Sequence, residues 1–216
     1  LRLGGEVVSA GSMQVYRGMD IGTAKPTPSE TLGVPHHMID VADPEENYSV
    51  ARYVQEAVPI VDGLLARSRL PIVAGGTGLY IDHLVAGRRF APFEPDSGLR
   101  QTLQRRVRDE GLPALREELE RVDPEAARRI HPNDEKRILR ALEVYLSTGK
   151  TITQHDRESQ EAPDRYTPLT IALNFRKRPD LWARIDRRVD EMMERGLGEE
   201  VRALLASGVP RDCTAM

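Results

Sequence analysis

The sequence has few cysteines and few aromatic residues: one cysteine, one tryptophan and three phenylalanines among 216 residues. The single cysteine, Cys213, excludes a disulfide within the chain and a zinc site built from a cysteine cluster. No apolar run approaches the roughly 18 residues that a membrane helix needs, and the first residues lack the apolar stretch of a signal peptide. We therefore expect no membrane association and, by default, a cytoplasmic location.

The charge also lacks an excess of either sign, with 31 Lys/Arg against 34 Asp/Glu and a net charge of −3. This balance does not favour nucleic-acid binding by the molecule as a whole, so any contact with RNA has to come from a local patch. Residues 88–150 contain 14 Lys/Arg and 12 Asp/Glu, whereas the remainder contains 17 and 22. This segment is the candidate for such a patch, although Arg/Glu-rich helices are often only solvated surfaces.

The first part of the chain has the pattern of an α/β fold. Short β-branched runs at residues 6–9 and 70–74 predict two buried strands. Residues 50–67 are helical in pattern with Ser49 as N-cap, and Pro59 is expected to kink or split this helix. Strands that alternate with helices predict a parallel sheet, whose ligands bind beyond the carboxyl ends of the strands.

The middle of the chain is helical in pattern throughout. Predicted helices cover residues 99–110, 113–121, 124–130 and 134–147. Asp123 is the expected N-cap of the third of these helices, and Gly149 is the expected end of the fourth. We interpret this region as a small helical subdomain inserted into the α/β core.

The last part returns to the α/β pattern, with a third predicted strand and two further helices. They cover residues 169–173, 179–195 and 197–207, and Gly196 and Gly208 end the two helices. We therefore predict an α/β core of residues 1–88 and 165–216 and a helical insertion of residues 89–164.

A glycine-rich turn, Gly75-Gly76-Thr77-Gly78, joins the second strand to a helical segment. Glycines let backbone N–H groups approach an anion closely, and the start of a helix adds the positive end of its dipole. Thr77 would then place a hydroxyl beside the substrate. A tight turn without any ligand is the equally acceptable alternative for this motif alone.

Two further polar segments support a site. Residues 9–26 come at the end of the first strand, and their polar residues are followed by Gly18, Gly22, a threonine and a lysine, as expected of an active-site loop. The adjacent His36 and His37 would point to opposite faces of a strand, so we expect hydrogen-bonding histidines and no metal site.

These segments together resemble the bacterial tRNA dimethylallyltransferase family, and the resemblance continues through residues 131–134 and 184–188 to the end of the chain. It implies a P-loop NTPase-like parallel sheet with an inserted all-helical subdomain. It also implies transfer of a dimethylallyl group from dimethylallyl diphosphate to N6 of the adenosine just 3′ of the anticodon of tRNA. Magnesium is the implied cofactor, diphosphate is released, and a monomer is expected.

The resemblance also implies roles for individual residues. Thr77 matches a threonine that assists departure of the diphosphate, and Arg184 and Arg188 share a helix face suited to binding it. A surface ion-pair network on that helix is the alternative. The implied tRNA-binding residues are Gly11, Ser12, Met13, Gln14, Arg100, Lys136, Arg137, Ile138, Leu139 and Arg140.

The sequence departs from the family pattern in two places. Gly11 stands where the family has an aspartate that is expected to accept a proton or hydrogen bond from N6, so we hypothesise impaired transfer. The family's phosphate loop should precede Leu1, and we therefore expect a fragment of a longer protein, shortened at both ends. Residues 148–151, Thr-Gly-Lys-Thr, follow a helix instead of a strand, and we interpret them as a helix end instead of that loop.

The sequence leaves three other functions open. The first is a P-loop kinase-type phosphotransferase, the second a catalytically inactive tRNA-binding fragment, and the third an isopentenyltransferase acting on a free nucleotide. ATP hydrolysis, RNA binding without product, and activity on AMP would respectively distinguish them.

Overall fold

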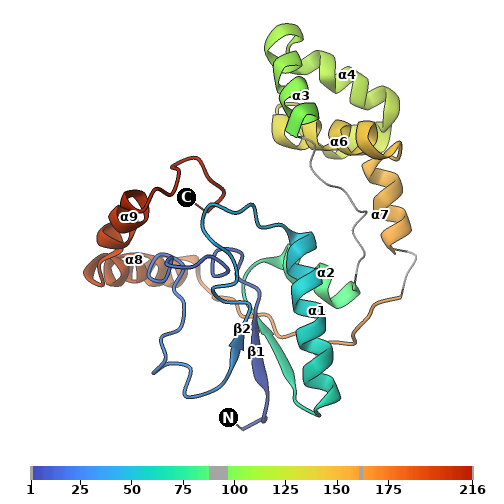
Figure 1. Cartoon of the computed structure of the whole chain (residues 1–216). Coiled ribbons are helices and arrows are strands. Elements are labelled where there is room, and N and C mark those ends of the chain that lie inside the picture. Colours follow the sequence, from blue (N-terminus) through green and yellow to red (C-terminus); the bar gives the residue numbers. More distant parts are fainter. Residues whose placement is uncertain (1, 88–96, 161–162, 216) are drawn as a thin grey trace. The chain divides into compact units, whose positions relative to one another are not determined.

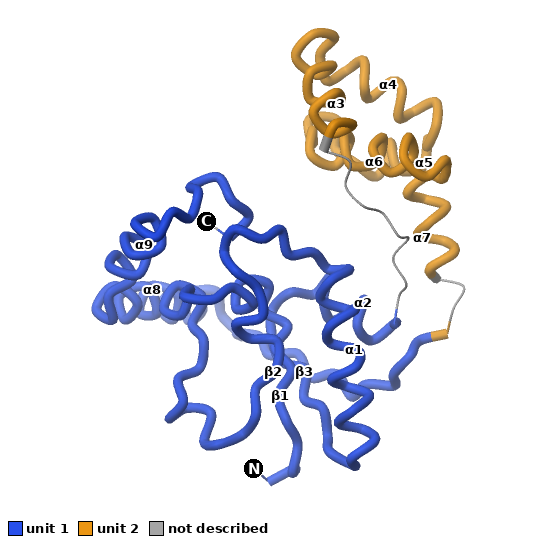
Figure 2. Tube along the Cα trace, in the orientation of Figure 1, with its two compact units in different colours: residues 1–87, 164–216 blue, residues 88–163 orange. Residues whose placement is uncertain are grey.

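The structure, a computed structural model, describes residues 2–87, 97–160 and 163–215. The chain forms two compact units (Figure 2). The α/β unit comprises Leu1–Gly87 with Asp164–Met216, and the helical unit comprises Arg88–Pro163. The boundary that the sequence predicts at residues 88 and 89 lies outside the described residues.

The α/β unit contains a parallel three-stranded sheet in the order β2-β1-β3 (Figure 1). The strands are β1 (Glu6–Ser9), β2 (His36–His37) and β3 (Pro71–Ala74), so the two strands expected at residues 6–9 and 70–74 are confirmed. β1 is buried except for Val7, whereas the first three residues of β3 are half-buried and Ala74 is exposed, which corrects the expectation of two buried strands. The central strand β1 thus brings the ends of both neighbours to one edge.

Helices α1 (Val50–Ala66) and α2 (Gly78–Ala86) pack against each other, and α1 also contacts β1 and β3. The Ser49 side chain accepts the Arg52 N–H as the predicted N-cap. Of the two expected effects of Pro59, a kink or a split, the split does not occur, because α1 is one continuous element. Burial of an apolar face compensates for the missing backbone hydrogen bond, since packing supplies most of the stability of a protein helix. That face comprises Tyr53, Val54, Ala57, Val61 and Leu64.

The last part of the α/β unit forms α8 (Arg178–Glu194) and α9 (Leu197–Ala206), as predicted. The third predicted strand is wrong, because residues 169–173 are irregular and Leu169, Ile171 and Leu173 are 90%, 77% and 94% exposed. A strand needs a hydrogen-bonded neighbour, and this segment pairs with none among the residues that the structure describes. α8 likewise has no buried residue within the described chain.

The helical unit contains α3 (Ser97–Glu110), α4 (Leu112–Val122), α5 (Pro124–Arg129), α6 (Glu135–Thr148) and α7 (Ile152–Gln160). The first four were predicted, and α7 was not. Their apolar faces form a core that includes Leu103, Leu115, Leu119, Ile138 and Leu142, all between 0% and 1% exposed. This burial explains why four short helices with many charged residues form a compact unit.

Asp123 connects two helices of this unit. Its carboxylate accepts the Ala126 N–H at 3.0 Å as the predicted N-cap of α5, and it accepts the Thr153 hydroxyl at 2.7 Å near the start of α7. Burial raises the pKa of Asp123, but these hydrogen bonds outweigh burial and hold the pKa below its ordinary value. The buried carboxylate is therefore charged, and its hydrogen bonds stabilise the helical unit.

Residues 148–151 form a helix end, as interpreted from the sequence. Gly149 closes α6 in the left-handed conformation with φ 71°, which glycine adopts without strain. Lys150 pairs with Glu158 at 2.6 Å. No helix in the described part of the chain is long and apolar enough to span a membrane.

Candidate functional site

The loops that follow β1 and β3 meet at the carboxyl edge of the sheet. The Ala10 N–H donates to the Ala74 carbonyl at 2.8 Å, and the Thr77 N–H donates to the Ala10 carbonyl at 3.1 Å. A Cβ atom at Gly75 would lie 2.4 Å from the Ala10 carbonyl carbon, so only glycine permits this approach. The predicted Gly-Gly-Thr-Gly turn is therefore a close junction between two loops at the edge where α/β proteins bind ligands.

Thr77 is half-buried at the start of α2, but its side chain does not cap the helix. Instead, its hydroxyl oxygen accepts the backbone N–H of Ser12 at 3.0 Å. A hydroxyl that accepts one hydrogen bond still has its own hydrogen to donate. Thr77 can therefore present an O–H donor to a group bound beside the junction.

The side chain of Gln14 forms its hydrogen bonds within the loop that contains it. Its amide nitrogen donates to the carbonyls of Thr23 and Ala24 at 3.2 Å each, and its amide oxygen accepts the Ser9 hydroxyl at 2.7 Å. Gln14 thus stabilises the loop of residues 9–26, and its predicted contact with the target nucleotide stays a prediction. Ser12 and Met13 are half-buried beside it.

Lys25, one of the polar residues of the same loop, is 6% exposed and stabilises that loop. Its ammonium donates to the Tyr16 carbonyl at 2.6 Å and to the carboxylates of Asp20 and Asp40 at 2.8 and 2.5 Å. A buried ammonium is stable only when it is paired in this way. No periodicity or cap in the sequence indicated that this lysine would be buried.

Gly11 lies next to Gln14, and its N–H donates to the Ser9 hydroxyl at 3.2 Å. A Cβ atom at Gly11 would lie 3.0 Å from the Gln14 amide oxygen. Such a contact is tight but involves the end of a flexible side chain. The position can thus accept a side chain after a small movement of Gln14.

The two histidines of β2 are hydrogen-bonded, as expected. His36 Nδ1 lies 2.8 Å from the Val34 carbonyl oxygen, and His37 Nε2 lies 2.7 Å from a carboxylate oxygen of Glu6. The hydrogen bond with His37 holds the pKa of Glu6 below its ordinary value. The described residues contain no group of three or more His, Cys, Asp or Glu side chains that could hold a metal ion.

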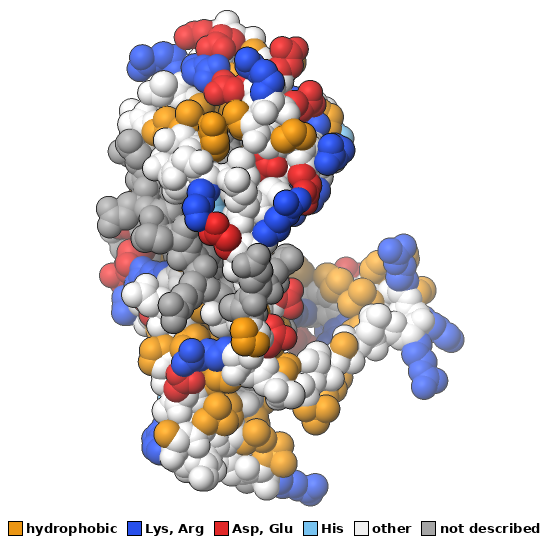
Figure 3. Space-filling model, turned by 90° about the vertical axis from the view of Figure 1, so that its right-hand side faces the viewer, with side chains coloured by type: hydrophobic (Ala, Val, Ile, Leu, Met, Phe, Trp, Pro, Cys, Tyr) orange, Lys and Arg blue, Asp and Glu red, His pale blue; other side chains and the backbone are white. Residues whose placement is uncertain are grey.

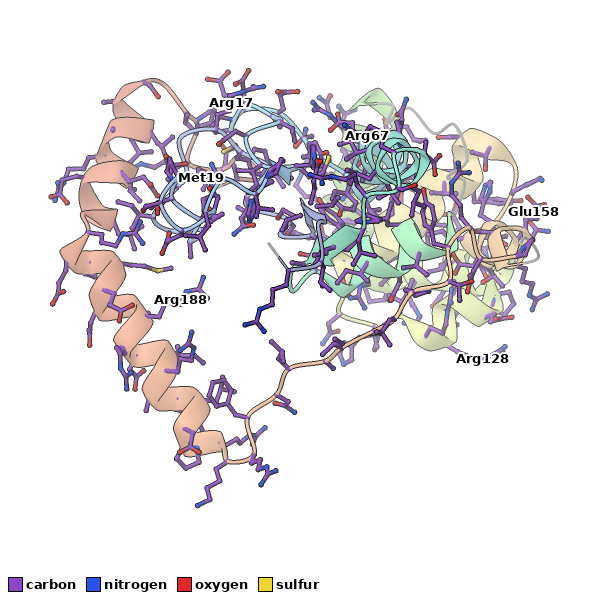
Figure 4. All side chains as sticks on the ribbon, turned by 90° about the horizontal axis from the view of Figure 1, so that it is seen from below. Arg17, Met19, Arg67, Arg128, Glu158 and Arg188 are labelled. Carbon is purple, nitrogen blue, oxygen red and sulfur yellow. The ribbon has the colours of Figure 1, made fainter. Side chains whose placement is uncertain are left out.

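Arg184 and Arg188 are exposed on α8. In Figure 4 the Arg188 side chain leaves α8 on the side where the loop carrying Met19 lies. Within the described chain neither arginine forms an ion pair, so the alternative of a surface ion-pair network is not observed. Two cations one helical turn apart are therefore available to an anion.

The predicted tRNA-binding residues of the helical unit divide into two groups. Lys136 and Arg137 are exposed on α6, whereas Ile138 and Leu139 are 0% and 1% exposed in the core. This burial corrects part of the prediction, because the side chains of Ile138 and Leu139 cannot touch RNA. Figure 3 shows Lys and Arg side chains interspersed with Asp and Glu side chains on the visible face of this unit.

Arg100 and Arg140 share one buried carboxylate. Glu143 is 3% exposed, and one of its oxygens lies 3.2 Å from Arg140 and 3.5 Å from Arg100. This pairing holds two partly exposed guanidinium groups at one carboxylate. The arrangement suits recognition of phosphate.

Comparison with known proteins identifies relatives of this chain. The sequence model of the IPP transferase family matches residues 14–216. The tRNA dimethylallyltransferase of Caldanaerobacter subterraneus subsp. tengcongensis is 48% identical over 100% of this chain and 69% of its own length. The tRNA dimethylallyltransferase of Thermomicrobium roseum is 50% identical over 100% of this chain and 64% of its own length.

Two solved structures are also similar. The full-length tRNA isopentenylpyrophosphate transferase of Bacillus halodurans is 42% identical with a TM-score of 0.64, covering 99% of this chain and 65% of that one. A eukaryotic dimethylallyltransferase acting on tRNA is 30% identical with a TM-score of 0.81, covering 99% and 52%. The chain spans about two thirds of the length of the bacterial relatives that it matches. It belongs to the IPP transferase family, to which the tRNA dimethylallyltransferases belong.

Proposed function

We propose that the protein transfers a dimethylallyl group from dimethylallyl diphosphate to N6 of the adenosine 3′-adjacent to the anticodon of tRNA. The observation that carries the proposal is the junction of the β1 and β3 loops, where Thr77 accepts the Ser12 N–H and keeps its own hydrogen for a substrate. Relatives named tRNA dimethylallyltransferase, 48% and 50% identical, support the choice of reaction.

The reaction that we propose is an in-line displacement. The N6 lone pair forms a bond to the allylic carbon while the bond from that carbon to the diphosphate oxygen breaks, and N6 then loses a proton to water. In this proposal the Thr77 O–H donates to the departing oxygen, which gains charge as the bond breaks. Arg184 and Arg188 supply positive charge for the diphosphate.

The site lacks the side chain that is expected to accept the proton from N6. A carboxylate at position 11 would accept the N6 proton, but this chain has glycine there. General-base catalysis contributes about 10²–10⁴-fold to such steps. We therefore propose a slow transfer that depends on Thr77 and on substrate positioning.

Magnesium enters the proposal as the counter-ion of the substrate's diphosphate. The described residues contain no group of three or more potential metal ligands, which does not fit a metal cage made by these residues alone. Magnesium commonly binds through phosphates and only one or two carboxylates. Bound in that way it would neutralise charge on the diphosphate.

We propose that the helical unit binds the anticodon stem-loop of the tRNA. Lys136, Arg137, Arg140 and Arg100 are partly or fully exposed and would contact phosphates. We also propose that the parallel sheet belongs to a P-loop NTPase-like fold, since β1 has a parallel neighbour on each side and the loops after β1 and β3 meet. The protein would act as a monomer in the cytoplasm, where tRNA is available.

The proposal is tested by incubating the protein with an anticodon stem-loop RNA and dimethylallyl diphosphate, followed by mass-spectrometric sequencing of the RNA. The expected product carries the added group on the adenosine 3′ of the anticodon. Parallel reactions with ATP alone and with AMP as acceptor test the kinase and free-nucleotide alternatives. RNA binding without any modified adenosine would support the inactive tRNA-binding alternative.

A further inference from the structure

Glu200 on α9 binds the loop of residues 9–26 from a distant part of the sequence. One of its carboxylate oxygens accepts the N–H groups of Asp20 and Ile21 at 2.8 and 2.7 Å, and the other accepts the N–H of Gly22 at 3.0 Å. The two segments are 178 to 180 residues apart in the chain. A single carboxylate thus satisfies three successive backbone donors.

Three successive N–H groups that converge on one point form a concave anion site. Hydrogen bonds from such groups to a charged acceptor are stronger than those to a neutral one. In this protein the anion is supplied by the chain itself. The geometry of residues 20–22 therefore depends on Glu200.

Apolar contacts place α9 against the same loop. A Cβ atom at Gly22 would lie 3.1 Å from the Leu197 side chain, and one at Gly18 would lie 3.6 Å from the Leu204 side chain. Leu204 is 9% exposed. The carboxylate is thus presented by a helix that packs on the loop, which distinguishes it from a free surface side chain.

The contacts of Glu200 continue to the candidate site. Residues 20–22 are followed directly by Thr23 and Ala24, whose carbonyls accept the Gln14 amide. Gln14 in turn accepts the Ser9 hydroxyl at the end of β1, beside the junction of Ser12 with Thr77. A loss of order at residues 20–22 would therefore reach the segment of residues 12–14.

We propose that Glu200 is a positioning residue that holds the loop of residues 9–26 in the conformation needed to receive the tRNA nucleotide. The proposal rests on the proposed function for its RNA partner. It makes Glu200, which lies outside the residues that contact substrate, a determinant of RNA affinity. Replacement by glutamine removes the charge and turns an NH₂ group toward one of the three N–H donors.

The experiment compares Glu200→Gln with the wild-type chain in two measurements. In wild-type protein the amides of residues 20–22 should be protected from hydrogen exchange, and Glu200→Gln should accelerate their exchange by about tenfold or more, the ratio expected for hydrogen bonds to a charged acceptor. The KM for anticodon stem-loop RNA should rise by about tenfold, while the KM for dimethylallyl diphosphate stays unchanged.

Glu199→Gln is the matched control. Glu199 is the preceding residue on α9 and pairs with Arg202 of the same helix at 2.8 Å. Its loss changes the net charge equally but removes no hydrogen bond or ion pair with the loop among the described residues. Both the exchange of residues 20–22 and the KM for RNA should match those of the wild type.

Glu200→Asp is the second variant, in case Glu200→Gln does not fold. It keeps the charge but shortens the side chain by one methylene group, so its exchange rates should lie between those of the other two proteins. Unchanged exchange at residues 20–22 in either variant would overturn the proposal. So would faster exchange accompanied by equal changes in both KM values, because that result indicates a purely structural role.

The role of Glu200 can be tested even if the proposed function is wrong. If the wild-type chain transfers no dimethylallyl group, hydrogen exchange and the dissociation constant of the anticodon stem-loop RNA still test Glu200. A variant with faster exchange and about tenfold weaker RNA binding would support the positioning role. A variant with faster exchange and unaltered RNA binding would overturn it.

Discussion

The backbone N–H of Ser12 donates a hydrogen bond of 3.0 Å to the hydroxyl oxygen of Thr77, a residue 65 positions later in the chain. The bond joins the loop after β1 to the loop after β3. It also fixes the Thr77 hydroxyl without using its hydrogen. The hydroxyl is thereby oriented before any substrate arrives, which is how a protein avoids reorganisation during a reaction.

Gly11→Asp should increase transfer. The new carboxylate would supply a proton acceptor for N6, and we expect the single-turnover rate with saturating RNA to rise by about 100-fold. The new Cβ would lie 3.0 Å from the Gln14 amide oxygen, so Gln14 has to move slightly. Gly11→Asn is the control, since it has the same size without the acidic group. No gain over Gly11→Asn would contradict the missing-base hypothesis.

Arg188→Ala should weaken binding of dimethylallyl diphosphate. Arg188 is exposed and forms no ion pair among the described residues, so its removal leaves no buried charge unpaired. We expect the KM for dimethylallyl diphosphate to rise by about tenfold, as for loss of a charge-assisted hydrogen bond. Arg187→Ala is the control, because it removes the same charge from the neighbouring residue of the helix. It should have little effect on the KM for dimethylallyl diphosphate. Equal effects of the two substitutions would contradict a specific diphosphate site.

Glu143→Gln should weaken RNA binding although it makes the protein more positive. The buried carboxylate of Glu143 orients Arg100 and Arg140, and its replacement by a neutral amide would weaken both pairings. We expect the dissociation constant for anticodon stem-loop RNA to rise about fivefold. Charge alone predicts tighter binding.

Glu118→Gln is the matched control for that measurement, because Glu118 pairs with Arg106 of the same unit at 2.8 Å. It should leave RNA binding unaltered or slightly stronger. Tighter binding by Glu143→Gln would show that Glu143 acts only through its charge.

Asp123→Ala should destabilise the protein in a pH-dependent way. The substitution removes the N-cap of α5 and the hydrogen bonds with Thr153, and we expect the free energy of unfolding at pH 7 to fall by about 2 kcal/mol. The pKa of Asp123 is lowered in the folded protein from its ordinary value of 3.8. The contribution is therefore complete above pH 3.8 and disappears as the pH falls through the lower folded-state pKa.

Urea unfolding at several pH values, followed by circular dichroism, measures this contribution. The difference between wild type and Asp123→Ala should shrink below pH 3.8. A difference that stays constant with pH would contradict the charged state assigned to Asp123.

Local signals allowed most helices to be predicted from the sequence. Asp123 at the start of α5 and the glycines at the ends of α6, α8 and α9 act within a few residues, and the apolar periodicity of α6 requires no distant partner. α7 was missed because its sequence, rich in polar residues, has only a weak apolar pattern.

Strands depend on distant partners, and there the prediction was less successful. β2 consists only of His36 and His37, and its pairing with β1 defines it as a strand. Residues 169–173 have the composition of a strand but no neighbouring strand in the described part of the chain. Composition alone could not distinguish these two cases.

In the candidate site, too, features that depend on neighbouring residues could be predicted, whereas contacts between distant parts of the chain could not. Thr77 and Ser12 lie in motifs that can be recognised from adjacent residues. The burial of Lys25 depends on Asp40, and the role of Glu200 depends on residues 20–22, which lie almost the whole chain away. Such contacts are visible only once the chain is folded.

The Thr77 hydroxyl is the group on which the proposed reaction depends most. Thr77→Ala removes it and leaves the Ser12 N–H without this acceptor, whereas Thr77→Ser retains it. The decisive measurement is the single-turnover rate of dimethylallyl transfer to anticodon stem-loop RNA at saturating concentrations of both substrates. We expect a loss of about 10²–10³-fold for Thr77→Ala and a rate near that of the wild type for Thr77→Ser. Transfer by Thr77→Ala at the wild-type rate would contradict the proposed role of this hydroxyl.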